Sequence, residues 1–215
     1  MKFDICNLIP EISNGFYFKC KMCGRCCKGK DEGYVFLFKD DIKKISNFLN
    51  ISLEKFLENY VEVIESTFRL FNPKLLKYKN KIFILKALVL KQNEETGVCI
   101  FLDNNNKCQI YEYRPHQCKT WPTWYNNLVK LEHFKNSKNK CIGFNINEFD
   151  IDEEEKEKYF ISKEKIYQTI KEEMEIEVEY IKRMKKYNQD FKKVFPYLKN
   201  VNYSFKIKYY NTNKK

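Results

Sequence analysis

The chain has few of the residues that interrupt regular structure or build common cofactor sites. Of its 215 residues, six are glycine, five are proline and two are histidine. None of the glycines forms a G-x-G-x-x-G loop, so a Rossmann-type cofactor site is not indicated. No apolar run approaches the roughly 20 residues that span a bilayer, and the N-terminal MKFDICNLIPEISNG lacks the apolar stretch of a signal peptide. These absences predict a cytoplasmic protein without a membrane partner.

Arginine is also scarce, although the formal net charge is +11. Lysine supplies nearly all of the excess, and Arg25, Arg69, Arg114 and Arg183 are dispersed along the chain. Arginine is the residue suited to bidentate recognition of phosphates and bases, so nucleic acid is not the expected partner. A zinc-stabilised nucleic-acid-binding protein stands as one alternative function. The basic charge instead predicts a docking face for an acidic protein partner.

Cysteine, by contrast, is abundant, with nine residues. Four of them crowd into the block CKMCGRCC at residues 20–27, and four more are spread over residues 99–141. In a reducing compartment this pattern points to metal binding or catalysis and not to disulfides. The candidate metal ligands are Cys20, Cys23, Cys26, Cys27, Cys99, Cys108, Cys118 and Cys141. Their sulfurs are enough for one or two metal centres, and Cys6 has no place in either group.

The spacing within the block bears on the choice of metal. Cysteine thiolates bind zinc tetrahedrally and are the usual ligands of iron–sulfur clusters. The run Cys20-x-x-Cys23-x-x-Cys26 has the spacing of the first three cysteines in bacterial ferredoxin loops. Zinc sites more often consist of two separated Cys-x-x-Cys pairs. The block therefore favours an iron–sulfur cluster of the 4Fe–4S kind, with zinc as the alternative. Cys27 is expected to point away from Cys26, toward a second centre.

The apolar pattern predicts an α+β fold around an irregular cysteine-rich core. Asp40 and Ser52 stand where helix N-caps are expected, ahead of two covering helices whose apolar stripes end at Leu49 and Ile64. Residues 166–184 carry apolar side chains three and four positions apart, with Glu and Lys between them. This spacing predicts a long amphipathic helix near the C-terminus.

Short apolar runs predict the strands. Residues 33–38 and 81–91 have the character of strands, and residues 203–210 that of an edge strand. The runs around Cys99 and Cys108 flank the turn sequence DNNNK, which predicts a β-hairpin. Such a hairpin would bring the two cysteines close together.

The character of the chain changes near residue 152, where DEEEKE indicates the solvated start of a helix. We therefore expect a cysteine-cluster domain over residues 1–150. Residues 151–215 are expected to form a helical extension that packs on it.

Three segments together resemble a known family. They are CKMCGRCC, the following GYVFLFKDDIKKI, and CIFLDNNNKCQIYEYRPHQCKTWP. This combination is similar to the YkgJ-like cysteine-cluster proteins, also called the CxxCxxCC zinc- or iron-chelating domain family. The resemblance covers roughly residues 17–145 and includes Cys141 in KCIGF. It implies a domain that binds a metal or cluster through the eight cysteines. We expect that centre to serve in a redox, scaffold or cluster-handling role.

The resemblance leaves the question of catalysis open. Flagellin lysine-N-methylases are similar in the cysteine block and are associated with an iron–sulfur cluster and methyl transfer to lysine. An iron–sulfur-dependent protein lysine N-methyltransferase is therefore the alternative function. Arg114 lies between Cys108 and Cys118, where it could donate hydrogen bonds to cluster sulfur. An ion pair that holds the loop is the other interpretation of Arg114.

Overall fold

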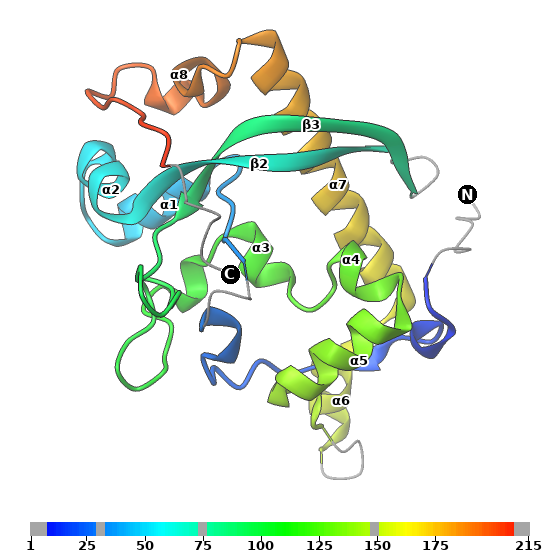
Figure 1. The fold of residues 1–215 in the computed structure, drawn as a ribbon. Coiled ribbons are helices and arrows are strands. Elements are labelled where there is room, and N and C mark those ends of the chain that lie inside the picture. The colour runs from blue at the N-terminus through cyan, green and yellow to red at the C-terminus, as the bar shows by residue number, and fades with distance from the viewer. Residues whose placement is uncertain (1–7, 29–32, 73–76, 147–150, 209–215) are drawn as a thin grey trace.

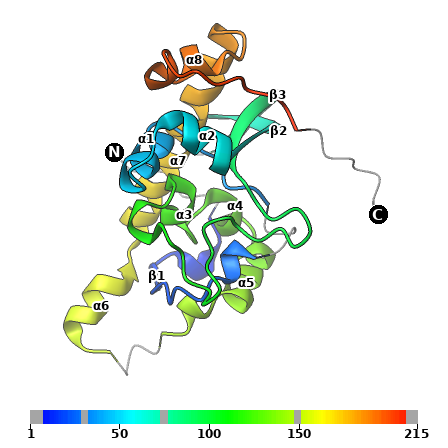
Figure 2. The ribbon, with the colours of Figure 1, turned by 90° about the vertical axis from the view of Figure 1, so that its left-hand side faces the viewer.

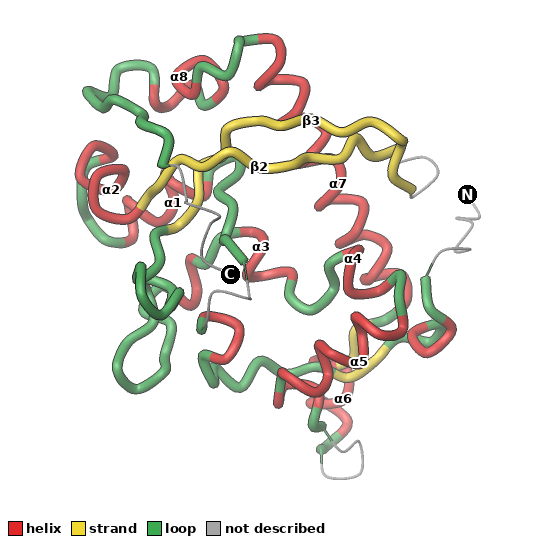
Figure 3. Tube along the Cα trace, viewed as in Figure 1, coloured by secondary structure: helices red, strands yellow, loops and turns green. Residues whose placement is uncertain are grey.

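The computed structural model describes residues 8–28, 33–72, 77–146 and 151–208. The fold is α+β, as predicted, with helices arranged around a long antiparallel hairpin (Figures 1 and 3). Its α-helices are α1 (Asp41–Phe48), α2 (Leu53–Tyr60), α3 (His116–Thr120), α4 (Tyr125–Leu128), α5 (Leu131–Lys140), α6 (Glu153–Tyr159), α7 (Lys163–Lys186) and α8 (Phe191–Val194). Its strands are β1 (Phe16–Tyr17), β2 (Val61–Asn72), β3 (Lys77–Leu90) and β4 (Phe160–Ile161).

The two predicted covering helices are α1 and α2, and they begin in different ways. The Ser52 hydroxyl accepts a hydrogen bond from the Lys55 N–H at 3.3 Å, which is the predicted N-cap of α2. Asp40 occupies the N-cap position of α1, but its side chain makes no capping bond. The carboxylate of Asp41 instead accepts from the Phe38 N–H at 3.0 Å. The first residue of α1, and not the N-cap residue, therefore closes the turn before the helix.

The prediction that the second helix continues to Ile64 is wrong beyond Tyr60. From Val61 the chain is extended and forms β2, which pairs with β3 in antiparallel register. Ile64 is buried and Glu65 is exposed, which is the alternation of a strand with one covered face. Pairing with a strand some twenty residues away overrides the local helical pattern, because each residue gains ladder hydrogen bonds and a buried face.

The strand predicted over residues 81–91 is confirmed within β3, but the remaining predicted strands are shorter than expected. Within residues 33–38, only Phe36 forms a bridge, to Val89. The DNNNK turn closes a single bridge between Leu102 and Cys108 in place of a regular hairpin. Ile207 forms one parallel bridge within the predicted edge strand, whose last two residues lie outside the described residues. The regular hairpin of this fold is β2–β3.

Two hydrophobic clusters form the interior, and α7 contributes to both. One lies beneath β2 and β3 with α1, α2 and α8, and it contains Ile181 and Met184 from the second half of α7. The other gathers α4, α5 and the N-terminal segment around Ile166 and Ile170. The predicted long amphipathic helix is confirmed, and Figure 2 shows it passing from the level of α5 to that of α8. The division at residue 150 stays a prediction.

Among the helices of the described residues, none combines the length and the apolar character of a membrane span.

Two acidic residues lie one turn apart on the face of α7 that meets α4. Glu173 Oε2 accepts a hydrogen bond from the Tyr125 N–H at 3.1 Å. Burial raises the pKa of Glu173 to about 8, and the neighbouring Glu177 adds to that rise. Burial also raises the pKa of Glu177 to about 7. Near neutral pH, the folded chain therefore holds protons that the unfolded chain releases.

Replacing Glu173 with glutamine is expected to stabilise the protein at pH 7.5 by roughly 3 kcal/mol. The carboxyl ionises near pH 4.5 in the unfolded chain but only near pH 8 in the folded one, so native stability falls as pH rises through that window. Glutamine keeps the acceptor for the Tyr125 N–H and never ionises. In urea unfolding, the variant should be no more stable than wild type at pH 4, and its extra stability should grow from pH 5 to 8. Glu175→Gln, on the exposed face, is the matched control, and a gain that does not vary with pH would contradict this explanation.

Candidate metal centre

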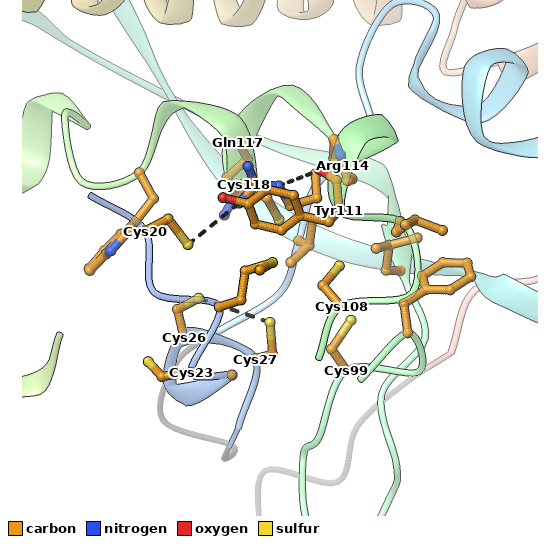
Figure 4. Close-up of a pocket in the computed structure, with 18 of the residues that line it drawn as sticks. Cys20, Cys23, Cys26, Cys27, Cys99, Cys108, Tyr111, Arg114, Gln117 and Cys118 are labelled. Atoms are coloured by element: carbon orange, nitrogen blue, oxygen red, sulfur yellow. Dashed lines mark hydrogen bonds between the residues drawn. The ribbon is translucent and has the colours of Figure 1, made fainter. Parts of the chain in front are cut away.

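All eight predicted cysteines line one cavity of about 100 Å³. They come from four separate parts of the chain, and Figure 4 shows most of their thiols directed toward a common space. The contributing parts are the loop of residues 20–27, the segment 99–108, helix α3 and the end of α5. All eight are free cysteines. The ninth, Cys6, lies outside the described residues.

The loop of residues 20–27 depends on glycine. Gly24 has a φ of +70°, a left-handed conformation that favours a residue without Cβ. A Cβ at Gly24 would lie 2.8 Å from the Asn106 carbonyl oxygen, so the loop is pressed against the DNNNK turn. A 3₁₀ turn over Arg25–Cys27 follows, in which the Cys27 N–H donates to the Gly24 carbonyl at 3.0 Å. Both constraints hold the cysteine block against the segment that carries Cys99 and Cys108.

The prediction that Cys26 and Cys27 point in different directions is wrong. Their sulfurs lie 3.9 Å apart, within contact distance of each other. The 3₁₀ turn accounts for this, because it replaces the extended backbone in which successive side chains alternate. Adjacent cysteines can therefore face the same cavity, and the block does not by itself imply two centres.

Cys99 and Cys108 are brought together by a short turn, as predicted from DNNNK. The Asp103 carboxylate accepts from the Lys107 N–H at 2.7 Å, which closes the turn. The Cys99 N–H donates to the Cys27 carbonyl at 2.8 Å and so ties this segment to the cysteine block. Figure 4 shows the thiols of Cys27, Cys99 and Cys108 gathered at one side of the cavity.

Cys118 lies on α3, which a network of polar side chains holds in place. The Gln117 amide accepts from the Phe36 N–H at 2.8 Å and donates to the Tyr34 carbonyl at 3.1 Å, as a strand neighbour would. The second oxygen of the Asp41 carboxylate accepts from the His116 N–H at 3.2 Å. Sequence reasoning missed both roles. The N-cap predicted at Asp40 was the nearest signal in the sequence, and it indicated only the start of a helix.

Cys141 approaches from the second hydrophobic cluster, where it ends α5. The Lys19 N–H donates to the Gly143 carbonyl at 3.0 Å and aligns this segment with the start of the cysteine block. The buried Trp121 indole N–H has no regular hydrogen-bond acceptor among the described residues. It lies close enough to the Cys141 thiol to lower its pKa, although burial has the larger and opposite effect. An unsatisfied donor at the cavity wall suits a site that receives an acceptor such as sulfide or thiolate sulfur.

The thiols disfavour ionisation in the absence of a cation. Burial raises the pKa of Cys99 to about 11 and raises that of Cys108, with neighbouring thiols adding to the effect. Burial places the pKa of Cys118 well above its usual value. The neighbouring Cys27 thiol raises the pKa of Cys26. A bound metal reverses this balance, because its charge stabilises the thiolates that coordinate it.

Arg114 brings a positive charge to the same cavity. Its guanidinium lies 3.7 Å from the Tyr111 ring centroid, and its Nε donates to the Tyr111 carbonyl at 2.7 Å. Its Nη1 lies 4.0 Å from the Cys20 sulfur, as Figure 4 shows. No ion pair with a carboxylate of the described residues accompanies these contacts. The geometry is that of a donor to sulfur, which was one of the two interpretations of Arg114.

The two tryptophans line the cavity, whereas the two histidines do not. Trp121 and Trp124 line the cavity with ring centroids 4.9 Å apart, where they limit the access of water. His116 does not line the cavity, although it is next to Gln117. His133 lies on α5, exposed, with Nδ1 2.9 Å from the Asn126 carbonyl oxygen. Sulfur is therefore the main donor type of the site.

The donor set fits a soft metal or an iron–sulfur cluster, because thiolates select zinc, copper(I) and iron–sulfur centres. In the described part of the chain, the thiols surround the cavity instead of closing on one point. No group of three or more His, Cys, Asp or Glu side chains there is drawn together tightly enough to hold a metal ion. What the structure assembles is a ring of sulfur donors, with the Arg114 guanidinium and the Trp121 indole also lining the cavity.

Comparison with known proteins agrees with the geometry. The family model named for its CxxCxxCC block, and described as "Putative zinc- or iron-chelating domain", matches residues 19–142. The match covers more than half of the chain and contains all eight cysteines of the cavity. No solved structure matches the chain.

Proposed function

We propose, from the premise that this chain belongs to the CxxCxxCC family of zinc- or iron-chelating domains, that its cavity holds a 4Fe–4S iron–sulfur cluster used in electron transfer. Zinc is the alternative occupant. Such a cluster supplies a one-electron couple whose potential depends on net charge, hydrogen bonds to sulfur and solvent exposure. Free cysteines throughout the site suit the reducing cytoplasm, which is where we expect the protein to act.

The observation that carries the proposal is the ring of eight thiols around a single cavity. A cavity of about 100 Å³ is well above the roughly 10–15 Å³ that holds one water molecule, which suits a body larger than one ion. The Cys-x-x-Cys-x-x-Cys spacing of the block supports the same choice. Four thiolates can ligate one cluster, and the other four are available to a second centre or to ligand exchange.

An electron-transfer role is supported by the position of the cavity near the surface. Cys26 is exposed, and Met22 beside it is 46% exposed. These residues bring one side of the site within reach of a docking partner. Trp121, Trp124 and Arg114 also line the cavity, where they limit the access of water.

Anaerobic purification followed by metal and sulfide analysis tests the proposal. We expect matched iron and acid-labile sulfide, in multiples of four per chain, with a brown colour that dithionite bleaches. Stoichiometric zinc without sulfide, in a colourless protein that dithionite leaves unchanged, would replace the cluster with a structural zinc site. Protein that binds neither iron nor zinc after anaerobic reconstitution would overturn the proposal.

Arg114→Gln is expected to lower the reduction potential of the bound cluster by roughly 50 mV, a little under a tenfold change in a one-electron equilibrium. The guanidinium near Cys20 stabilises the extra negative charge of the reduced state, so its removal makes reduction harder. Arg114→Lys keeps the charge and is the matched variant, with a shift of less than half that size. Electrochemical titration measures both, and a potential unchanged in the glutamine variant would show that Arg114 only holds the loop.

A further inference from the structure

One edge of the long hairpin is covered along only part of its length. The edge in question is the side of β3 that faces away from β2. Near its end, the Leu88 carbonyl accepts from the Leu37 N–H at 2.9 Å, and the Leu90 N–H donates to the Val35 carbonyl at 2.9 Å. Residues 35–37 therefore act as a third strand over the last part of β3.

At Lys86, side chains take the place of a third strand and satisfy the two backbone groups on this edge. The Lys86 N–H donates to the Gln189 Oε1 at 2.8 Å, and the Lys86 carbonyl accepts from the Tyr180 hydroxyl at 2.7 Å. Backbone groups of an antiparallel strand alternate between its two sides, so Ile84 and Ile82 point theirs to the same edge as Lys86. In the described part of the chain, no hydrogen bond to these outward groups accompanies those of Lys86. The edge is open at these two residues.

The open edge also carries the most exposed large apolar side chains of the described fold. Ile84 is 69% exposed and Ile82 is 58% exposed. In the hairpin they stand opposite Thr67 and Arg69, on the face turned away from the hydrophobic cluster. Figure 1 shows this part of the hairpin reaching past α7. Free backbone groups beside exposed β-branched residues are a template for another strand.

Lysines flank the open edge. Lys81 and Lys185 place their ammonium groups 5.8 and 4.6 Å from the ring centroid of Phe83, so both lie beside the middle of the open stretch. Lys79 and Lys186 are exposed close by in sequence. No carboxylate of the described residues forms an ion pair with any of these four lysines. The edge therefore combines open backbone groups with unpaired positive charge.

We propose that the β3 edge at Ile82–Ile84 binds an extended acidic segment of a partner protein, which adds to the hairpin as a strand. Backbone pairing, contact with the two isoleucines and neutralisation of the flanking lysines would each contribute. A second copy of the chain is disfavoured, because it would bring the same lysines and a net charge of +11 against them. This surface is separate from the cysteine cavity, so the proposal does not rest on which cofactor the cavity holds.

Wild-type protein and three labelled peptides test the proposal by fluorescence anisotropy. The probe is a fluorescein-labelled peptide of ten residues in which Glu and Val alternate. A second peptide carries N-methyl groups on alternate residues, on the side that would pair, and a third replaces Glu with Lys. We expect the first to bind. The other two should bind at least about tenfold more weakly, because one loses backbone hydrogen bonds and the other loses charge complementarity.

A pair of double variants locates the binding site. Lys81→Glu with Lys185→Glu should weaken binding of the acidic peptide about tenfold at low salt. Lys135→Glu with Lys165→Glu changes the charge equally but places one reversal on α5 and the other at the far end of α7, about 30 Å from Lys185. This control should bind as wild type does. Circular dichroism confirms that each variant is folded, and the peptide comparison on wild-type protein stands even if one is not.

Several outcomes would overturn the proposal. Equal binding of the N-methylated peptide would show that no strand is added, and equal losses in both double variants would indicate general attraction of charge. Absence of binding at 1 mM peptide would exclude this occupant. Sedimentation that reveals a dimer broken by the Lys81 and Lys185 changes would assign the edge to a second copy. Release from phosphatidylserine vesicles by the same changes, without peptide binding, would assign it to a membrane surface.

Discussion

Cys118→Ser is expected to remove most of the bound metal and to lower the free energy of unfolding by more than about 4 kcal/mol. Its thiol lies among those of Cys26, Cys99 and Cys108, and a serine hydroxyl does not replace a thiolate as a ligand for a soft metal. Metal binding and folding are coupled, because a ligand set drawn from distant parts of the chain is assembled only in the folded state. Metal content and urea unfolding of the purified variant measure the two effects together.

Two comparisons show whether the loss is specific to the ligands. Cys23→Ser should also lower metal content and stability, since Cys23 belongs to the Cys-x-x-Cys-x-x-Cys run. Cys6→Ser should leave both unchanged, because Cys6 stands outside both groups of cysteines in the sequence. Full metal stoichiometry in Cys118→Ser would contradict the ligand assignment. A proportional loss in Cys6→Ser would show that the wrong eight cysteines were chosen.

The features that the sequence predicts well are local ones. The Ser52 cap and the apolar stripe of α7 depend on residues within a few turns of one another, and the structure confirms both. The closeness of Cys99 and Cys108 follows from a five-residue turn whose Asn and Asp residues favour it. The crowding of the cysteine block needs no tertiary information at all.

The features that the sequence fails to predict depend on distant partners. Val61–Asn72 becomes a strand because β3 pairs with it, and the helical spacing of its first residues is overridden. Gln117 and Asp41 hold α3 through contacts with residues about 80 positions away, which no local pattern indicates. The direction of the Cys27 side chain depends on a 3₁₀ turn that Gly24 makes possible. In each case the missing information is a long-range contact.

The metal centre also joins the two hydrophobic clusters of the fold. Cys99 and Cys108 pack against the cluster beneath the hairpin, whereas Cys141 packs against the cluster around α5. A metal bound by thiols from both sides would therefore hold the two clusters together. Substitutions in either cluster should weaken metal binding only where they move a segment that carries a cysteine.

Phe101→Ala tests whether a core substitution weakens the metal centre by moving its ligands. We expect it to cost about 3–5 kcal/mol of unfolding free energy and to weaken metal retention as well. Phe101 is 1% exposed and lies between Cys99 and Cys108 in the sequence. Its ring stacks on Tyr60 with centroids 4.8 Å apart, which anchors the turn to α2. Its removal leaves a cavity and releases the segment that carries both thiols.

Phe191→Ala is the matched control for Phe101→Ala. Phe191 is also buried, at 3% exposure, but it lies in α8, packs against Phe195 and Phe205, and is not among the described residues that line the cysteine cavity. It should cost a similar free energy of unfolding, because the lost side chain is the same. Competition with a chelator under native conditions should release metal several-fold faster from Phe101→Ala than from wild type, and at the wild-type rate from Phe191→Ala. Equal release from both variants would show that global stability alone governs the centre, and that the turn at Phe101 does not position its ligands.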